Sequence, residues 1–221
     1  MAIPKTIFQT FKSSKLPFIT RWHINRFRKR NPEYNYEFYD DQRIEEFFKS
    51  QFPLEVFNAY KKLNIGAAKA DFFRYAILYR KGGVYLDIDS GISGRLDDFI
   101  RPDDTAIITK EGDPSLFAQY ALVYAAGHPF LRNTIDMVVE NISLNKFPND
   151  VHAMTGPTVY TNAIKESLQE DPNIPHRVLG TDYNGHLKVK YRFGKFFLYK
   201  RGDHWKKQQL TTPVIKTDLH T

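Results

Sequence analysis

The fold is decided by residues 82–89, which read Gly-Gly-Val-Tyr-Leu-Asp-Ile-Asp. The two glycines end a preceding helix, because glycine adopts a positive φ without the steric cost of a Cβ atom. A strand is predicted over residues 84–89, so that Tyr85, Asp87 and Asp89 share one face and the apolar residues between them share the other. Two carboxylates at the carboxyl end of a strand lie where open α/β sheets bind ligands.

Asp87 and Asp89 would repel each other, and burying them would cost desolvation energy. A divalent cation relieves both effects. Oxygen ligands in a chain without cysteine favour Mg²⁺ or Mn²⁺, which also bind the oxygens of a substrate phosphate. The two aspartates alone also fit a strand that simply ends in a turn.

A helix is predicted over residues 66–81, directly before this strand. Asp71 and Arg74 are three positions apart and therefore lie on the same helix face. They form either an ordinary surface ion pair or an acceptor and a donor presented together to a hydroxylated or phosphorylated ligand.

The rest of the chain alternates strands with helices, which favours an α/β fold with a mainly parallel sheet. A long surface loop is predicted over residues 170–195 and a flexible tail over 206–221. The other predicted strands are 5–11, 34–39, 105–109, 119–123 and 195–200, and the other predicted helices are 18–30, 41–49, 53–62, 129–144 and 156–168. The length of 221 residues fits a single domain.

Composition excludes several classes of protein. Hydrophobic residues make up 42% and aromatic residues 15%, and cysteine is absent, which excludes a disordered chain, a disulfide scaffold and thiol catalysis. The longest apolar run is about half of the ~20 residues that a membrane helix needs, and no signal peptide is recognised. We therefore expect a soluble, cytoplasmic protein that is not secreted.

Charge is unevenly distributed along the chain, whose net charge is +7. Residues 1–30 hold eight Lys or Arg and no acid, and residues 185–221 carry a net charge of +7, so that the middle of the chain is acidic. Basic ends around an acidic middle indicate an anionic ligand, with nucleic acid, a nucleoside diphosphate and an anionic glycan as candidates. A solvated basic surface fits the same distribution.

Residues 70–89 carry the pattern Ala-Asp-x-x-Arg-Tyr-x-x-Leu-Tyr-x-x-Gly-Gly-x-Tyr-Leu-Asp-x-Asp. This pattern resembles the Asp-x-Asp sugar-binding region of family 32 glycosyltransferases, which include yeast initiating mannosyltransferases, bacterial capsule transferases and chlorovirus capsid-glycan transferases. Weaker likenesses extend over roughly residues 3–205. Phe8 and Phe11 stand where the family usually has His and Trp, so the nucleobase pocket is expected to differ in detail.

The resemblance implies a single GT-A catalytic domain over residues 1–221 that moves a hexose from a nucleotide sugar to a glycan or glycoprotein with retention of configuration. A UDP-sugar such as UDP-glucose is the favoured donor, Mn²⁺ or Mg²⁺ the implied cofactor, and a monomer the default state. The leaving diphosphate, rather than an enzymatic base, would take the acceptor proton. The short chain favours a viral or bacterial enzyme.

The resemblance also implies roles for particular residues. The catalytic candidates are Asp71, Arg74, Asp87 and Asp89. The metal candidates are Asp87, Asp89 and His204. The donor-binding candidates are Phe8, Gln9, Thr10, Phe11, Asp71, Arg74, Tyr85, Asp87 and His204.

Two other classes of protein fit part of the sequence. A basic nucleic-acid-binding module would account for the pI of about 9.4, but no RNP-like, zinc-finger or helix-turn-helix pattern is present, and we expect no nucleic-acid partner. A metal-dependent phosphohydrolase acting on nucleotides could use Asp87 and Asp89, but such enzymes often need a second group of His and Asp ligands, and none is recognised.

Overall fold

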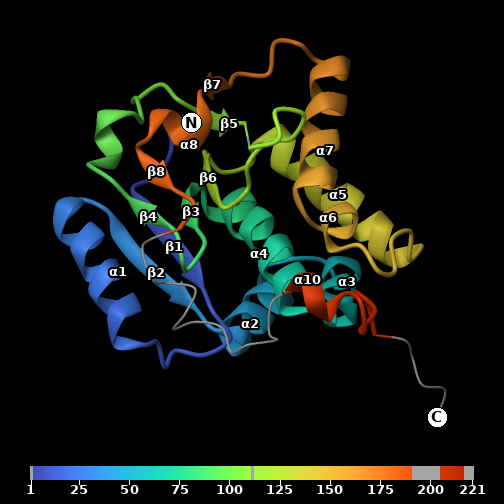
Figure 1. The fold of residues 1–221 in the computed structure, drawn as a ribbon. Coiled ribbons are helices and arrows are strands. Elements are labelled where there is room, and N and C mark those ends of the chain that lie inside the picture. The colour runs from blue at the N-terminus through green and yellow to red at the C-terminus, as the bar shows by residue number, and fades with distance from the viewer. Residues whose placement is uncertain (1, 111, 191–204, 217–221) are drawn as a thin grey trace.

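The computed structural model describes residues 2–110, 112–190 and 205–216 (Figure 1). Its strands are β1 (Thr6–Thr10), β2 (Asn35–Tyr39), β3 (Gly83–Leu86), β4 (Gly91–Ile92), β5 (Ala106–Thr109), β6 (Ala121–Tyr124), β7 (Arg177–Leu179) and β8 (Leu187–Lys188). Its α-helices are α1 (Phe18–Arg30), α2 (Asp41–Gln51), α3 (Leu54–Lys62), α4 (Gly66–Lys81), α5 (Pro129–Ser143), α6 (Val151–Met154), α7 (Pro157–Glu170), α8 (Thr181–Asn184) and α10 (Trp205–Gln208), and a 3₁₀ helix covers Leu96–Asp98.

The central sheet has six strands in the order β2-β1-β3-β6-β5-β7. β6 runs antiparallel to its neighbours β3 and β5, whereas the other pairs are parallel. Five strands therefore point the same way, and the predicted α/β fold with a mainly parallel sheet is confirmed. β4 and β8 form a separate antiparallel pair.

The sheet is buried on both faces, because its side chains alternate between two hydrophobic cores. Phe8 and Tyr85 point into the core that is shared with α2 to α7. Their neighbours Ile7 and Val84 point into the core that is shared with α1 and with residues 88–99. In Figure 1 the helices α4, α5 and α7 accordingly lie on one side of the sheet and α1 on the other.

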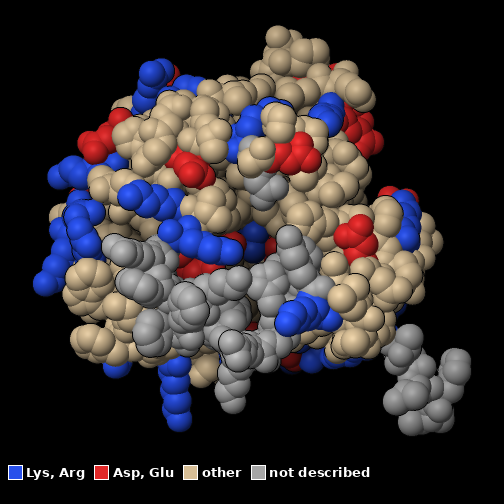
Figure 2. Space-filling model, in the orientation of Figure 1, with Lys and Arg blue, Asp and Glu red and all other residues tan. Residues whose placement is uncertain are grey.

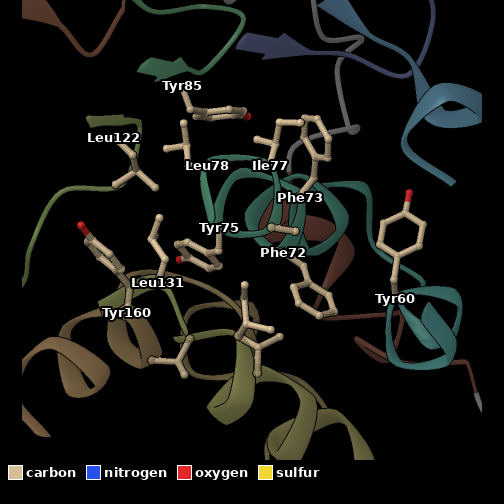
Figure 3. Close-up of a cluster of buried hydrophobic side chains, with 14 of the residues drawn as sticks. Tyr60, Phe72, Phe73, Tyr75, Ile77, Leu78, Tyr85, Leu122, Leu131 and Tyr160 are labelled. Carbon is tan, nitrogen blue, oxygen red and sulfur yellow. The ribbon is translucent and has the colours of Figure 1, made fainter. Parts of the chain in front are cut away.

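Helix α4 is buried on nearly every side, and Figure 3 shows it at the centre of the larger core. Tyr85 and Leu122 approach it from the sheet, and Leu131 and Tyr160 from α5 and α7. The apolar side chains that cover most of this helix suit such a position.

Gly82 and Gly83 end α4 and begin β3, with φ angles of 64° and 113°. A Cβ atom on Gly82 would lie 2.6 Å from the backbone nitrogen of Ala126, and one on Gly83 would lie 2.6 Å from the carbonyl oxygen of Thr6. Both positions therefore require glycine for conformation and for space. This close passage fixes where β3 enters the sheet.

The elements predicted between residues 5 and 168 agree with the structure to within two residues at each end, with one exception. Strand β3 ends at Leu86 rather than at Asp89, because the chain turns there: the backbone nitrogen of Ser90 donates to the carbonyl oxygen of Asp87. Asp40 caps helix α2, since its side chain accepts from the backbone nitrogen of Arg43.

The prediction of a surface loop over residues 170–195 was wrong for the described part of that segment. β7 adds an edge strand beside β5, and the Arg177 side chain fixes it through an ion pair with Asp104, 2.6 Å long. Tyr183 is fully buried and donates to the carbonyl oxygen of Ala121. Only three residues of β7 pair with the sheet, which is too short a run for the alternation of a strand to be recognised.

The predicted flexible tail over residues 206–221 is also corrected, as far as residue 216. Val214 is fully buried, and its backbone nitrogen donates to the carbonyl oxygen of Pro148. Ile215 forms a β-bridge with Leu63 at the end of α3. The strand predicted over 195–200 lies outside the described residues, and no described helix is long and apolar enough to cross a membrane.

Candidate active site

The turn after β3 presents two carboxylates at the carboxyl edge of the sheet. The backbone nitrogen of Asp87 donates to the carbonyl oxygen of Tyr120, and the Asp87 carbonyl accepts from the side chain of Gln9, 3.1 Å away. These bonds hold the backbone on both sides, so that Asp87 and Asp89 both reach the same cavity. The early end of β3 therefore does not separate the two aspartates.

This cavity has a volume of about 430 Å³, within the range of small-molecule sites. The end of β1, the start of α4, the turn after β3 and the segment before β6 form its walls. In Figure 2 acidic and basic side chains meet in a hollow near the centre of the view. The acids that line the cavity are Asp41, Asp71, Asp87 and Asp89, and the bases are Lys12, Lys69, Arg74 and Lys190.

Arg74 links two of these acids. One terminal nitrogen, Nη2, lies 3.0 Å from Asp71 Oδ1 and 2.9 Å from Asp87 Oδ1, and Nη1 donates to the carbonyl oxygen of Gln119. Its guanidinium lies 5.0 Å from the centre of the Tyr85 ring. Arg74 is only 4% exposed, so the alternative of an ordinary surface ion pair is excluded.

Asp71 is held from three sides. Besides the Arg74 contact, its carboxylate accepts from the side-chain amide of Gln119 at 3.2 Å and from the hydroxyl of Thr155 at 3.1 Å. Tyr75 donates to the other end of the Gln119 amide and so fixes its orientation. Burial raises the pKa of Asp71 to about 7, Arg74 opposes this shift and the charge of Asp87 adds to it.

Asp89 is 8% exposed and has no ion pair to a described residue. Burial is the main reason that its pKa is raised to about 6, and the charge of Asp87 raises it further, whereas Lys190 opposes both. The pKa of Asp87 is also raised by burial, although Arg74 and the Tyr85 hydroxyl oppose the shift. One guanidinium therefore balances only part of the charge of three neighbouring carboxylates, and the site favours an added cation.

The donor set fits a hard divalent cation. Asp87 and Asp89 offer carboxylate oxygens only, which are the ligands that Mg²⁺ and Mn²⁺ prefer. Among the described residues no group of three or more His, Asp or Glu side chains is placed to hold a metal. Water and substrate oxygens would have to complete the coordination of a bound ion, as is usual for Mg²⁺.

The predicted donor-binding residues at the end of β1 are divided between core and cavity. Thr10 and Phe11 line the cavity, as does Tyr85. Phe8 is fully buried in the core, and Gln9 is fully buried as a support for Asp87, so the structure does not bring these two side chains to the cavity. His204, the remaining candidate, lies outside the described residues.

Sequence reasoning missed several residues of the site. Thr155 begins the stretch Thr-Gly-Pro at 155–157, within the region of weaker likeness, and Lys190 belongs to the basic C-terminal region. Gln119 carries no signal in the sequence, because its role depends on the register of β6 against β3. These side chains complete the cavity or its support.

Comparison with known proteins is consistent with this geometry. Residues 20–107 match the family described as "Glycosyltransferase sugar-binding region containing DXD motif". These residues, less than half of the chain, are therefore similar to that sugar-binding region. The match encloses Asp71, Arg74, Asp87 and Asp89, the residues that the cavity brings together.

Similar proteins are glycosyltransferases. The chain is 28% identical to an initiation-specific alpha-1,6-mannosyltransferase of Schizosaccharomyces pombe, over 75% of this chain and 49% of that protein. It is 29% identical to an uncharacterized glycosyltransferase of Acanthamoeba polyphaga mimivirus, over 82% of this chain and 72% of the viral protein. The chain thus spans about half the length of the yeast relative.

Solved structures confirm the GT-A fold. The ligand-free glycosyltransferase domain of the YGT toxin superposes with a TM-score of 0.62 over 83% of this chain and 82% of that domain, at 11% identity. At this identity the likeness concerns the fold alone.

Proposed function

We propose that this protein is a metal-dependent glycosyltransferase that moves a hexose from a nucleoside diphosphate sugar to a hydroxyl group of a glycan or glycoprotein. The observation that carries the proposal is the cavity in which Asp71, Arg74, Asp87 and Asp89 meet. The match of residues 20–107 to a sugar-binding region and the glycosyltransferase relatives support it.

Asp87 and Asp89 would hold the cation, which supplies positive charge to the diphosphate leaving group as its negative charge grows. Arg74 keeps the Asp87 carboxylate in place and neutralises part of its charge before any substrate binds. Lys190 lies close enough to both aspartates to oppose the rise in their pKa values, and it would attract the diphosphate to this end of the cavity.

Asp71 is suited to orient the sugar. An ionised carboxylate has about four acceptor positions, and Arg74, Gln119 and Thr155 occupy three of them. The remaining position would accept a donor-sugar hydroxyl in a direction that these three partners fix. Phe11 and Thr10, at the end of β1, would contact the nucleoside.

In the proposed reaction the bond between the anomeric carbon and the diphosphate oxygen breaks, and the acceptor oxygen bonds to the same face of that carbon. The acceptor proton passes to the leaving diphosphate. This route retains the anomeric configuration and requires no protein base, and it follows the resemblance given above.

The relatives favour mannose as the transferred hexose, because the yeast protein is a mannosyltransferase. UDP-glucose, the donor favoured from the sequence, is the competing choice. Calorimetry with GDP-mannose, UDP-glucose and UDP, each with and without Mn²⁺, distinguishes the two. We expect one nucleotide sugar to bind in a Mn²⁺-dependent manner and this binding to be lost in Asp89→Asn. Folded protein that binds none of them would overturn the donor assignment.

A further inference from the structure

A second groove, with a volume of about 550 Å³, lies between helix α1 and the β4–β8 pair. Its lining is strongly basic, and none of the described residues that line it is an acid. Figure 2 shows Lys and Arg side chains gathered along the left edge of the molecule, the side on which α1 lies in Figure 1. The basic residues of the groove are His23, Arg26, Arg30, Lys188 and Lys190.

Most of this charge is not neutralised by neighbours. Arg26 and Lys188 form no ion pair with a described residue, whereas Lys190 is partly balanced by Asp87 and Asp89 of the neighbouring cavity. Arg30 donates to the carbonyl oxygen of Ser93 at 3.1 Å, which fixes its guanidinium at the groove without removing its charge. Cations that converge on one concave surface without counter-charges attract an anion more strongly than the same cations spread over the surface.

The groove adjoins the cavity of the candidate active site. Lys190 lines both the groove and the cavity of the candidate active site. The β4–β8 pair that carries Lys188 is attached to the turn after β3, since Ser90 donates to the carbonyl oxygen of Val189 at 2.9 Å. An anion in the groove would therefore lie beside the mouth of the cavity, near Asp89.

We propose that this groove binds the phosphate group of a hydroxylated acceptor and so presents an acceptor hydroxyl to the donor cavity. The inference rests on the proposed function and narrows its acceptor to a phosphate-bearing one. The same chemistry is offered by a soluble phosphosugar and by the headgroup of an anionic lipid. Phe18 and Trp22 on α1 are 74% and 45% exposed, which makes a lipid source worth testing beside the soluble one.

Trp22 provides a direct readout, because its ring lies 4.9 Å from the His23 ring and 5.4 Å from the Arg26 guanidinium. The chain has two tryptophans, so Trp205→Phe leaves Trp22 as its only tryptophan. In this background we expect the fluorescence of Trp22 to change with the concentration of glucose 6-phosphate and to reach a plateau, and we expect glucose to have no effect. Arg26→Gln with Lys188→Gln should weaken the binding of glucose 6-phosphate by about tenfold or more.

Arg21→Gln with Lys29→Gln is the matched control, since it removes the same charge from α1 residues that do not line the groove. Equal weakening by both double variants, or equal binding of glucose and glucose 6-phosphate, would overturn the proposal. The proposal would also be overturned if glucose 6-phosphate failed to bind and an RNA oligonucleotide bound tightly to both the wild type and the groove variant.

Vesicle sedimentation separates the two sources of phosphate. Binding to phosphatidylglycerol vesicles but not to phosphatidylcholine vesicles, with loss in the groove variant, would assign a lipid headgroup; binding of glucose 6-phosphate alone would assign a soluble acceptor. These assays need no donor. If glucose 6-phosphate binds but no nucleotide sugar does, the proposed function fails and the anion site stands, whereas the opposite pattern removes only the anion site.

Discussion

Removal of the Asp89 carboxylate should stabilise the metal-free protein while it abolishes function. Asp89 is 8% exposed, and burial together with the charge of Asp87 raises its pKa from 3.8 to about 6. A carboxyl group whose pKa is higher in the folded protein favours folding only in its protonated form. Its favourable contribution is therefore complete below pH 3.8 and is lost as the pH rises toward 6.

Above pH 6 the charged side chain costs the fold about 3 kcal/mol, since each pKa unit corresponds to about 1.4 kcal/mol. Asparagine keeps the size of the side chain and removes the charge, but it also loses some acceptor capacity. We therefore expect Asp89→Asn to gain about 2 kcal/mol at pH 8, which raises Tm by about 4–8 °C for a chain of this size.

Differential scanning calorimetry in EDTA at pH 8 and pH 4 measures this effect. The gain should be present at pH 8 and vanish at pH 4. Saturating Mn²⁺ at pH 8 should raise the Tm of the wild type and leave Asp89→Asn unchanged.

Asp97→Asn is a control of opposite sign, because Lys5 and Tyr34 lower the pKa of Asp97 despite partial burial. That variant should lose stability at pH 8. A lower Tm for Asp89→Asn at pH 8 in EDTA, or a gain of equal size at pH 4, would refute the electrostatic account of the site.

Three further predictions concern residues outside the cavity. Gly83→Ala should lower the free energy of unfolding, measured in urea, by more than about 2 kcal/mol, because Gly83 has a φ of 113° and a Cβ atom there would clash with a backbone oxygen. Gly66→Ala is the control and should not destabilise the protein, because a Cβ atom on Gly66 would meet open space. Burial lowers the pKa of His128 to about 4, so its neutral imidazole stabilises the fold at neutral pH, and this contribution is lost as the pH falls from 6.5 toward 4. In thermal melts, His128→Asn should remove this part of the pH dependence of Tm. Arg177→Ala should destabilise β7 by about 1–3 kcal/mol at pH 7, because it leaves the buried Asp104 carboxylate without its ion pair. The pKa of Asp104 is lowered in the folded protein, so the effect of the variant should shrink below pH 3.8, where the carboxylate becomes protonated. An unchanged pH profile in His128→Asn, or equal effects of Arg177→Ala at both pH values, would contradict the last two.

The sequence predicted those parts of the fold that depend on local patterns. Helix α4 and the glycines that end it follow from apolar content and from the conformational freedom of glycine. Asp71, Arg74, Asp87 and Asp89 were recognised because they belong to one continuous pattern over residues 70–89. The structure brings these four residues to one cavity, as the pattern indicates.

The parts that were missed depend on contacts between distant segments. Gln119 and Thr155 bind Asp71 from 48 and 84 positions away in the sequence, and no local pattern around either residue indicates these contacts. The burial of Phe8 follows from strand alternation within β1, which the likeness to a nucleotide-binding segment does not reveal. β7 escaped recognition because an edge strand of three residues gains its pairing from β5 rather than from its own pattern.

The most direct test of the proposed reaction is the release of nucleoside diphosphate from nucleotide sugars, measured with wild type and Asp89→Asn in the presence of Mn²⁺ or EDTA. We predict release from a single donor, with GDP-mannose favoured over UDP-glucose, that requires Mn²⁺ and falls about a thousandfold or more in Asp89→Asn. Release that is equally fast in EDTA or in Asp89→Asn, or no release from any donor by folded protein that binds Mn²⁺, would contradict it.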